Sequence, residues 1–448
     1  MNDHVSPRRR REVIDALRRG TVPANGLDLL AVGLDRFVPA LDADLDTAAG
    51  GGSAFKAVRG EYGAGKTFLA RYLAERALRR GFAAAEVQIS ETETPLHKLE
   101  TVYRRAGEAL QTAAFPPSAL RPVLDSWLFT LETDVTAADP DLAGQGQAAV
   151  EAAVGVLLER RLAAVSARAP AFAQALRSYR AAVTHGETAT ADALAAWLGG
   201  QPHVAAAAKR SAGIRGELDH FGAMAFFQGL LEVLRDAGHP GLLLVLDEVE
   251  TLQRVRGDVR DKALNALRQL LDEIDAGRYP GLFLLITGTP AFYDGPSGVP
   301  RLAPLAQRLA TDFSTDPRFD NPRAVQIRLP GFDRDALLTL GMRVRDLYAV
   351  GAAEPDRVAK TVDDAYVGEL ADAVTGSLGG KVGVAPRVFL KKLVADVLDR
   401  VDQFGDFDPR RHYALTLTAG ELSEQERNAA ALSAPPAARA GDVDLDLP

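Results

Sequence analysis

The chain has 448 residues, which fits two or three domains rather than one compact core. Its hydrophobic share of 47% is ordinary for a globular protein. The formal net charge of −8 argues against a histone-like coat of positive charge, although not against a local basic groove. Cysteine is absent, which excludes disulfides, thiolate zinc sites and cysteine nucleophiles. No apolar run reaches about 18 residues and the N-terminus lacks an apolar signal core, so we expect a cytoplasmic protein without a membrane partner.

The first 50 residues begin polar and basic. "SPRRRREVIDALRRG", residues 6–20, holds six arginines and predicts a short helix closed by Gly20. The arginines suit phosphate docking, but a solvated helix start explains them slightly better. A second amphipathic helix is expected within residues 21–46, and "GGGS" at residues 50–53 predicts a flexible break before the next strand.

The next segment has the pattern of a parallel β-α-β unit. Residues 54–60 predict a strand, residues 68–80 a helix that stops at Gly81, and residues 82–90 an apolar strand with a polar end. Residues 96–238 differ, because they are rich in alanine and leucine at helical spacing. They predict a helical insertion between two strands of the sheet, far longer than an ordinary connection.

The sheet resumes after this insertion. Strands are expected at residues 241–250, 281–290 and 323–332, with a helix at 258–276. Three helical segments follow up to residue 401, then a short strand in "HYALTL" and a tail of disordered composition. The expected divisions are 1–95, the N-terminal helices and first part of the core; 96–240, the insertion; 241–332, the second part of the core; 333–420, a helical lid with a short extension; and 421–448, the tail. The expected fold class is α/β, a parallel sheet with flanking helices.

"GEYGAGKT", residues 60–67, matches the phosphate-loop pattern G-x-x-x-x-G-K-[ST] at every fixed position. The glycines let backbone N–H groups curl around phosphate oxygens, and the following helix points its positive end at the same anion. Lys66 should reach the β- and γ-phosphates, and the Thr67 hydroxyl should ligate Mg²⁺. The residues expected to hold the nucleotide here are Gly60, Glu61, Tyr62, Gly63, Ala64, Gly65, Lys66, Thr67 and Phe68.

"LLLVLDEVE" places two acids after an apolar run that is typical of a doubly buried strand. At the carboxyl end of such a strand, Asp247 would hold Mg²⁺ and Glu248 would polarise the attacking water. The alternative is that Asp247 only caps a helix, but a cap does not explain the pair. The acidic pair and the lack of an N-K-x-D sequence favour ATP over GTP as the cofactor.

Five further positions are candidate sensors or fingers. Thr287 and Thr289 end the strand after the acidic one, where they would touch the γ-phosphate or its water, or simply form a turn. Arg308, and less strongly Arg301, would act on a neighbouring subunit's γ-phosphate, although most surface arginines do not. Arg387 opens the last helix after a glycine-rich approach and would place a cation on bound ATP; the alternative is a solvated first-turn arginine.

The order "GEYGAGKT", "VLDEVE", "ITGTP", "GVAPRVFLKKL" resembles AAA+ ATPases, in particular the group near origin-recognition and Cdc6-like proteins. The resemblance covers residues 15–90 and 240–415 and implies a helical lid with a sensor arginine at Arg387. It departs from that group after the lid, because too few residues follow for a winged-helix DNA-binding domain.

A closer resemblance covers the insertion as well. "VIDALRRGTVP", "GEYGAGKTF", "ISETETPLHKLETVYR" and "GGKVGVAPRVFLKKLVADVLDRV" are similar to the ATP-binding proteins of BREX bacteriophage-defence systems, of the BrxD type. By that analogy Val22 and Pro23 of "GTVP" would lie near the adenine. The resemblance implies an ATPase that acts beside other defence proteins.

The expected function is therefore a Mg²⁺- and ATP-dependent hydrolase that couples ATP to assembly or remodelling of a phage-defence complex. We expect a homo-oligomer on ATP binding, other defence-system proteins as partners, and DNA as a further candidate. The alternative is an ATP-gated switch or scaffold with negligible turnover.

Overall fold

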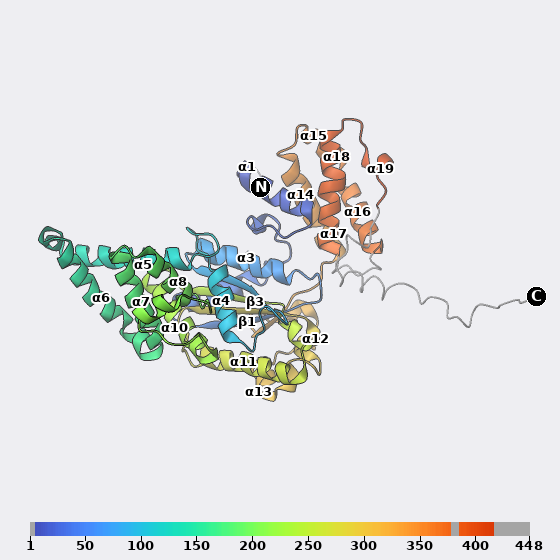
Figure 1. Cartoon of the computed structure of the whole chain (residues 1–448). Helices are drawn as coiled ribbons and strands as arrows, with labels where there is room; N and C mark the ends of the chain where they lie inside the picture. The colour runs from blue at the N-terminus through green and yellow to red at the C-terminus, as the bar shows by residue number, and fades with distance from the viewer. Residues whose placement is uncertain (1–4, 378–384, 416–448) are drawn as a thin grey trace, which may run out of the picture. The chain divides into compact units, whose positions relative to one another are not determined.

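The computed structural model describes residues 5–377 and 385–415. It divides into two compact units (Figure 1). The first contains Met1–Arg36, Gly60–Tyr72 and Leu329–Pro448, and the second contains Phe37–Arg59 and Leu73–Arg328. The glycine-rich approach to Arg387 and the predicted disordered tail lie outside the described residues.

The second unit is built around a five-stranded parallel sheet in the order β2-β3-β4-β1-β5. The strands are β1 (Ala54–Arg59), β2 (Ala83–Gln88), β3 (Leu242–Asp247), β4 (Leu282–Gly288) and β5 (Gln326–Arg328). Every residue of β3 and β4 is buried, which explains their unbroken apolar sequences. The predicted α/β class with a parallel sheet is confirmed.

Helices cover this sheet. Helices α2 (Val38–Ala49) and α11 (Gly257–Asp275) both contact β1, and α4 (Leu99–Ala109) packs on β2. The "GGGS" segment predicted as a flexible break is a hydrogen-bonded turn. Gly52 N–H donates to Thr47 O over 3.0 Å, its carbonyl accepts from Gly281 N–H over 2.7 Å, and Ser53 Oγ donates to Ile274 O over 2.9 Å.

The long segment between β2 and β3 is helical, as predicted. After α4 come α5 (Leu120–Ala138), α6 (Gln147–Arg168), α7 (Pro170–Thr184), α8 (Thr188–Leu198), α9 (Ala206–Ser211) and α10 (His220–Asp236). In Figure 1 α5 to α8 and α10 gather into one bundle. Its centre is aromatic: Phe226 makes edge contacts with Tyr103, Phe172 and Trp197 at centroid distances of 5.0–5.7 Å.

The first unit holds α1 (Pro7–Arg19) and the C-terminal helices, which Figure 1 shows together. These are α14 (Arg334–Ala349), α15 (Pro355–Thr361), α16 (Asp364–Ser377), α17 (Ala385–Lys391), a π-helical stretch Lys392–Leu398, α18 (Asp399–Gln403) and α19 (Pro409–His412). Sequence reasoning missed α15. The strand predicted in "HYALTL" is wrong for its described part, because His412 ends α19 and residues 413–415 form no strand.

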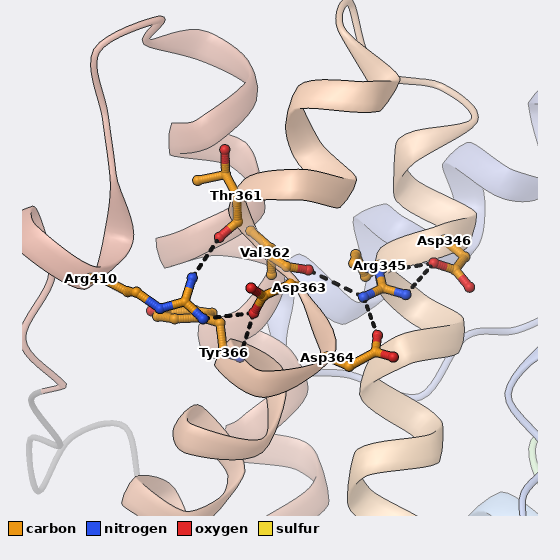
Figure 2. Close-up of polar contacts among 8 residues, drawn as sticks. All are labelled: Arg345, Asp346, Thr361, Val362, Asp363, Asp364, Tyr366 and Arg410. Carbon is orange, nitrogen blue, oxygen red and sulfur yellow. Dashed lines mark hydrogen bonds and ion pairs between the residues drawn. The ribbon is translucent and has the colours of Figure 1, made fainter.

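Polar contacts connect these C-terminal helices (Figure 2). Arg345 of α14 pairs with Asp364 at 2.5 Å and donates to Val362 O at 3.3 Å. Arg410 of α19 donates to Asp363 at 2.6 Å, and Asp363 also accepts the Tyr366 N–H at 2.8 Å, at the start of α16. Among the described residues, no helix is both long and apolar enough to cross a membrane.

Candidate functional site

The second unit places polar residues at the ends of three neighbouring strands. Because β2, β3 and β4 are parallel and in register, Gln88 pairs with Asp247, and Leu246 with Ile286. Their carboxyl ends therefore meet at one edge of the sheet, where ligands bind in open α/β sheets. The chain leaves β1 at the same edge, one residue before Gly60.

Asp247 and Thr287 form the buried centre of this edge. Asp247 is 4% exposed and Thr287 is 0% exposed. The Thr287 hydroxyl donates to Asp247 Oδ1 and accepts the Glu248 N–H at 3.1 Å, and that N–H also reaches Asp247 Oδ1 at 3.2 Å. Thr287, expected to touch the γ-phosphate or its water or to form a turn, is bonded in this structure to Asp247, the predicted Mg²⁺ ligand.

Glu248 has an unusual backbone. Its φ of 60° and ψ of 43° put it in the left-handed region, which is costly for a residue with a branched or long side chain. It occupies the N-cap position of a short 3₁₀ helix, Val249–Gln253, and no side chain caps that helix. Asp247 is therefore the last strand residue and does not cap a helix, which was the alternative for the acidic pair.

Sequence reasoning missed Gln88. Its Nε2 donates to Glu248 Oε2 at 3.0 Å, so the end of β2 holds the side chain predicted to polarise water. The signal for it was the polar end of an otherwise apolar strand, but only the sheet order places that end beside Glu248.

The phosphate loop belongs to the first unit. Gly63 and Gly65 have φ values of 76° and 90°, so the curl of the loop needs glycine at both positions. Lys66, 8% exposed, donates from Nζ to Gly60 O at 2.9 Å and Glu61 O at 3.2 Å. The Tyr62 ring lies 5.3 Å from Nζ. The loop thus folds around its own lysine and opens α3 (Lys66–Arg79), whose first N–H groups lack helical partners.

The other predicted loop residues have distinct settings. Ala64 is buried, Glu61 is exposed and Thr67 is half-buried. A side chain at Gly60 would lie only 3.1 Å from the Ala64 methyl carbon. Phe68, half-buried, packs against the hydrophobic core of the first unit. Thr67 is thus placed at the first turn of α3, where a hydroxyl can reach a cation held by phosphates.

Arg387 and the predicted adenine segment lie side by side in the first unit. Gly20 closes α1 in the left-handed conformation, and a side-chain carbon there would lie 3.7 Å from Arg387 Nη1. Pro23, three residues on, is buried and Val22 is half-buried. The turn after α1 therefore sits against the start of α17.

The candidate finger arginines make ion pairs within the chain. Arg301 makes two hydrogen bonds to Asp261, of 2.9 and 3.2 Å. Arg308, the last residue of α13 (Ala303–Arg308), pairs with Asp272 at 2.6 Å and with Asp275. All three acids lie on α11. Thr289 is half-buried at the N-cap position of α12 (Pro290–Asp294), without a side-chain cap bond.

Each unit, taken by itself, carries one residue of a type that Mg²⁺ accepts when phosphates share its coordination shell. Among the described residues no group of three acidic or histidine side chains is gathered to hold a metal alone. Mg²⁺ normally takes one or two protein oxygens and completes its shell with phosphates and water. Asp247 supplies a buried carboxylate and Thr67 a hydroxyl of the expected types.

The parallel sheet with its acidic strand end and the glycine-lysine-threonine loop after the first strand define an α/β protein that carries a phosphate-loop sequence. The chain belongs to the family of BREX system ATP-binding proteins BrxC/D, whose model matches residues 5–417. The match does not distinguish the BrxC and BrxD types.

No curated protein matches the chain. Among solved structures, the ORC2 protein of Aeropyrum pernix, in its ADPNP-ADP complexes, is similar with a TM-score of 0.31 and 13% identity. The match covers 88% of this chain and 70% of that one.

Proposed function

We propose that the chain is an AAA+ ATPase of a BREX defence system, which couples ATP binding and hydrolysis to assembly or remodelling of a defence complex. The observation that carries the proposal is the strand-end cluster of Asp247, Glu248 and Thr287 in a chain of this family that also carries the Lys66 loop. Buried Asp247 would hold Mg²⁺, and Glu248 would orient the attacking water.

The loop and the C-terminal helices have complementary roles in this proposal. Lys66 would exchange its two carbonyl acceptors for phosphate oxygens when ATP binds, since a charged amine prefers an anionic acceptor. Arg387 would add a cation on the nucleotide, beside Val22 and Pro23. Release of phosphate would then remove the anion that both cations share, and the lid helices would respond.

The test compares steady-state ATP hydrolysis of the wild type with Glu248→Gln, which keeps the side chain's size but removes its charge. We expect turnover to fall by about 10²-fold or more, the range that a general base supplies. Fluorescent-ATP binding should persist in Glu248→Gln and be lost in Lys66→Ala. Equal turnover of wild type and Glu248→Gln, with and without DNA, would refute the hydrolase.

A second candidate function is an ATP-gated switch with negligible turnover. Two observations favour it: Gln88 holds the Glu248 carboxylate, and both candidate fingers are bound to α11. For such a switch, we expect the protein to assemble when ATP binds and to show no measurable ATP hydrolysis. Mass measurement with ADP and with a slowly hydrolysed ATP analogue distinguishes a constant monomer from ATP-dependent oligomers.

Trans action of Arg308 can be tested by mixing. If Arg308 serves the site of a neighbouring copy, Arg308→Ala and Lys66→Ala proteins, each inactive alone, should regain activity together. The absence of rescue at every mixing ratio would remove Arg308 from that role. A mixture of Arg301→Ala and Lys66→Ala proteins tests Arg301, the other arginine expected to act on a neighbouring subunit, in the same way.

A further inference from the structure

Helix α1 and the C-terminal helices of the first unit enclose a cavity of about 230 Å³. We call it the α1 cavity. Its polar lining consists of Arg10, Arg11, Asp15, Arg18, Tyr348 and Asp402. Three guanidinium groups therefore face one space with two carboxylates.

The acids of the α1 cavity already have other donors. Asp15 pairs with Arg18, and Arg18 also makes two bonds to Asp399, of 2.6 and 2.9 Å. Asp402 accepts the Ala353 N–H at 2.9 Å and the Tyr348 hydroxyl at 3.4 Å. Asp15 is thus paired within α1, and Asp402 is bonded to the end of α14 and the segment that follows it, so neither carboxylate pairs with Arg10 or Arg11.

Arg10 and Arg11 differ from the other arginines of the first turns. Arg8 pairs with Glu12, and Arg9 pairs with Asp28. Within residues 5–377 and 385–415, no ion pair involves Arg10 or Arg11. Arg10 is half-buried against Gly351, where a side chain would lie 2.9 Å from its Nε. Packing therefore restrains its guanidinium, which has no acidic partner in the part of the chain that the structure describes.

These arginines lie at the N-terminus of a helix, where the helix dipole is unfavourable for cations. The first turns of α1 carry four consecutive arginines, and no acid lies in its first turn. The helix dipole makes an N-terminus favourable for anions and unfavourable for cations. Arg8 and Arg9 have acidic partners, but Arg10 and Arg11 break this preference with no ion pair among the described residues, as is expected at a functional site, and an anion is the group that would match them.

Phosphate is the anion whose geometry matches guanidinium, which binds it through paired N–H bonds. Arg8, Arg11 and Arg19 continue along the exposed face of α1 over about 16 Å, a length over which duplex DNA carries about nine charges. A single small phosphate would not need such a row. We propose that the α1 cavity and this row bind the phosphate backbone of DNA, with no reading of sequence.

The inference takes up DNA, which the sequence analysis gave as a candidate partner, and goes beyond the proposed function; the acidic chain makes it more specific. With a net charge of −8, general attraction to DNA is absent, so binding must come from a local cluster. Each phosphate neutralised contributes about −0.9 to the slope of log K against log salt concentration. Removing Arg10 and Arg11 should therefore make the slope less negative by about 1.8.

The experiment measures binding of full-length protein to a fluorescent duplex, without nucleotide, from 50 to 200 mM salt. Arg10→Ala/Arg11→Ala is compared with Arg10→Lys/Arg11→Lys, which keeps the charge, and with Arg160→Ala/Arg168→Ala. The last pair removes two exposed arginines of α6 that have no ion pair in the described parts of the chain. Thermal unfolding shows whether each variant is folded.

We expect the alanine pair at α1 to lose at least about tenfold in affinity and about 1.8 in slope, while the lysine pair retains most of the slope. Unchanged binding would overturn the inference, as would an equal loss in the α6 control or a wild type that does not bind DNA. Lys66→Ala tests nucleotide use separately from DNA binding. If the α1 variants do not affect DNA binding, the proposed ATPase is not contradicted, and if Lys66→Ala still binds ATP, the proposed DNA site is not contradicted.

Discussion

Gln88 Nε2 donates a 3.0 Å hydrogen bond to Glu248 Oε2, joining the ends of two adjacent parallel strands. The bond occupies one oxygen of the carboxylate expected to orient water. The resting arrangement therefore restrains the proposed base.

Gln88→Ala should release this restraint. We expect basal turnover to rise by about tenfold, because about 1.4 kcal/mol, within the range of a typical hydrogen bond, corresponds to a factor of ten in rate. Gln201→Ala is the matched control, because Gln201 makes a 2.9 Å bond of the same kind to Glu108. Steady-state hydrolysis measures both variants. A fall in turnover with Gln88→Ala would show that the bond positions Glu248 for catalysis and does not restrain it.

Thr287→Val tests the buried hydroxyl. The change leaves Asp247 without its Thr287 donor and removes one acceptor of the Glu248 N–H. Because all these atoms lie at the buried strand ends, we expect a loss of about 1–3 kcal/mol in the free energy of unfolding, together with reduced turnover. Urea unfolding and ATP hydrolysis measure the two effects.

Thr287→Ser is the internal control for that change, because it retains the hydroxyl and loses only a methyl group. We expect it to recover most of the hydrolysis rate. Thr289→Val is the control for position in the unfolding measurement only, since Thr289 makes no cap bond. If Thr287→Val unfolds at the wild-type urea concentration, the hydroxyl does not stabilise Asp247.

The sequence predicted the strands and the loop because their signals are local. The unbroken apolar residues of β3 and β4, and the fixed positions Gly65 and Lys66, need no knowledge of distant neighbours. The Gln88–Glu248 bond and the pairing of Arg308 with α11 depend on strand order and helix packing, so no local pattern indicates them. The predicted strand is wrong over its described residues, 412–415, because an aspartate cap, Asp408, starts a short helix that includes His412.

The left-handed backbone of Glu248 allows a prediction about stability that is separate from catalysis. Asparagine tolerates this conformation better than other non-glycine residues. The free energy of unfolding of Glu248→Asn should therefore exceed that of Glu248→Ala by about 1 kcal/mol in urea unfolding. Both variants should be inactive in hydrolysis. The same two changes at exposed Glu91, where φ is not positive, should not differ. Equal stability of Glu248→Asn and Glu248→Ala would mean that the strain is absent in solution.

The ion pair of Asp363 with Arg410 predicts a pH dependence (Figure 2). The side-chain hydrogen bond from Arg410, followed by the Tyr366 N–H, lowers the pKa of Asp363 below its usual value. A lowered pKa stabilises the folded state above the unfolded value of about 3.9, and this contribution is lost as the pH falls through the folded pKa. Since Asp363 is half exposed, the contribution should be below about 1 kcal/mol.

Arg410→Ala should therefore destabilise the protein at pH 6 and lose this difference from the wild type as the pH falls below about 4, because protonated Asp363 no longer attracts the guanidinium. Urea unfolding midpoints across pH 3–6 measure this convergence. Arg411→Ala, at the exposed neighbouring arginine whose contact with Asp408 is 3.6 Å, should run parallel to the wild type. If the two midpoint curves for wild type and Arg410→Ala keep a constant separation down to pH 3, Arg410 acts on α16 through packing and its carbonyl contact with Thr361, and not through the charge of Asp363.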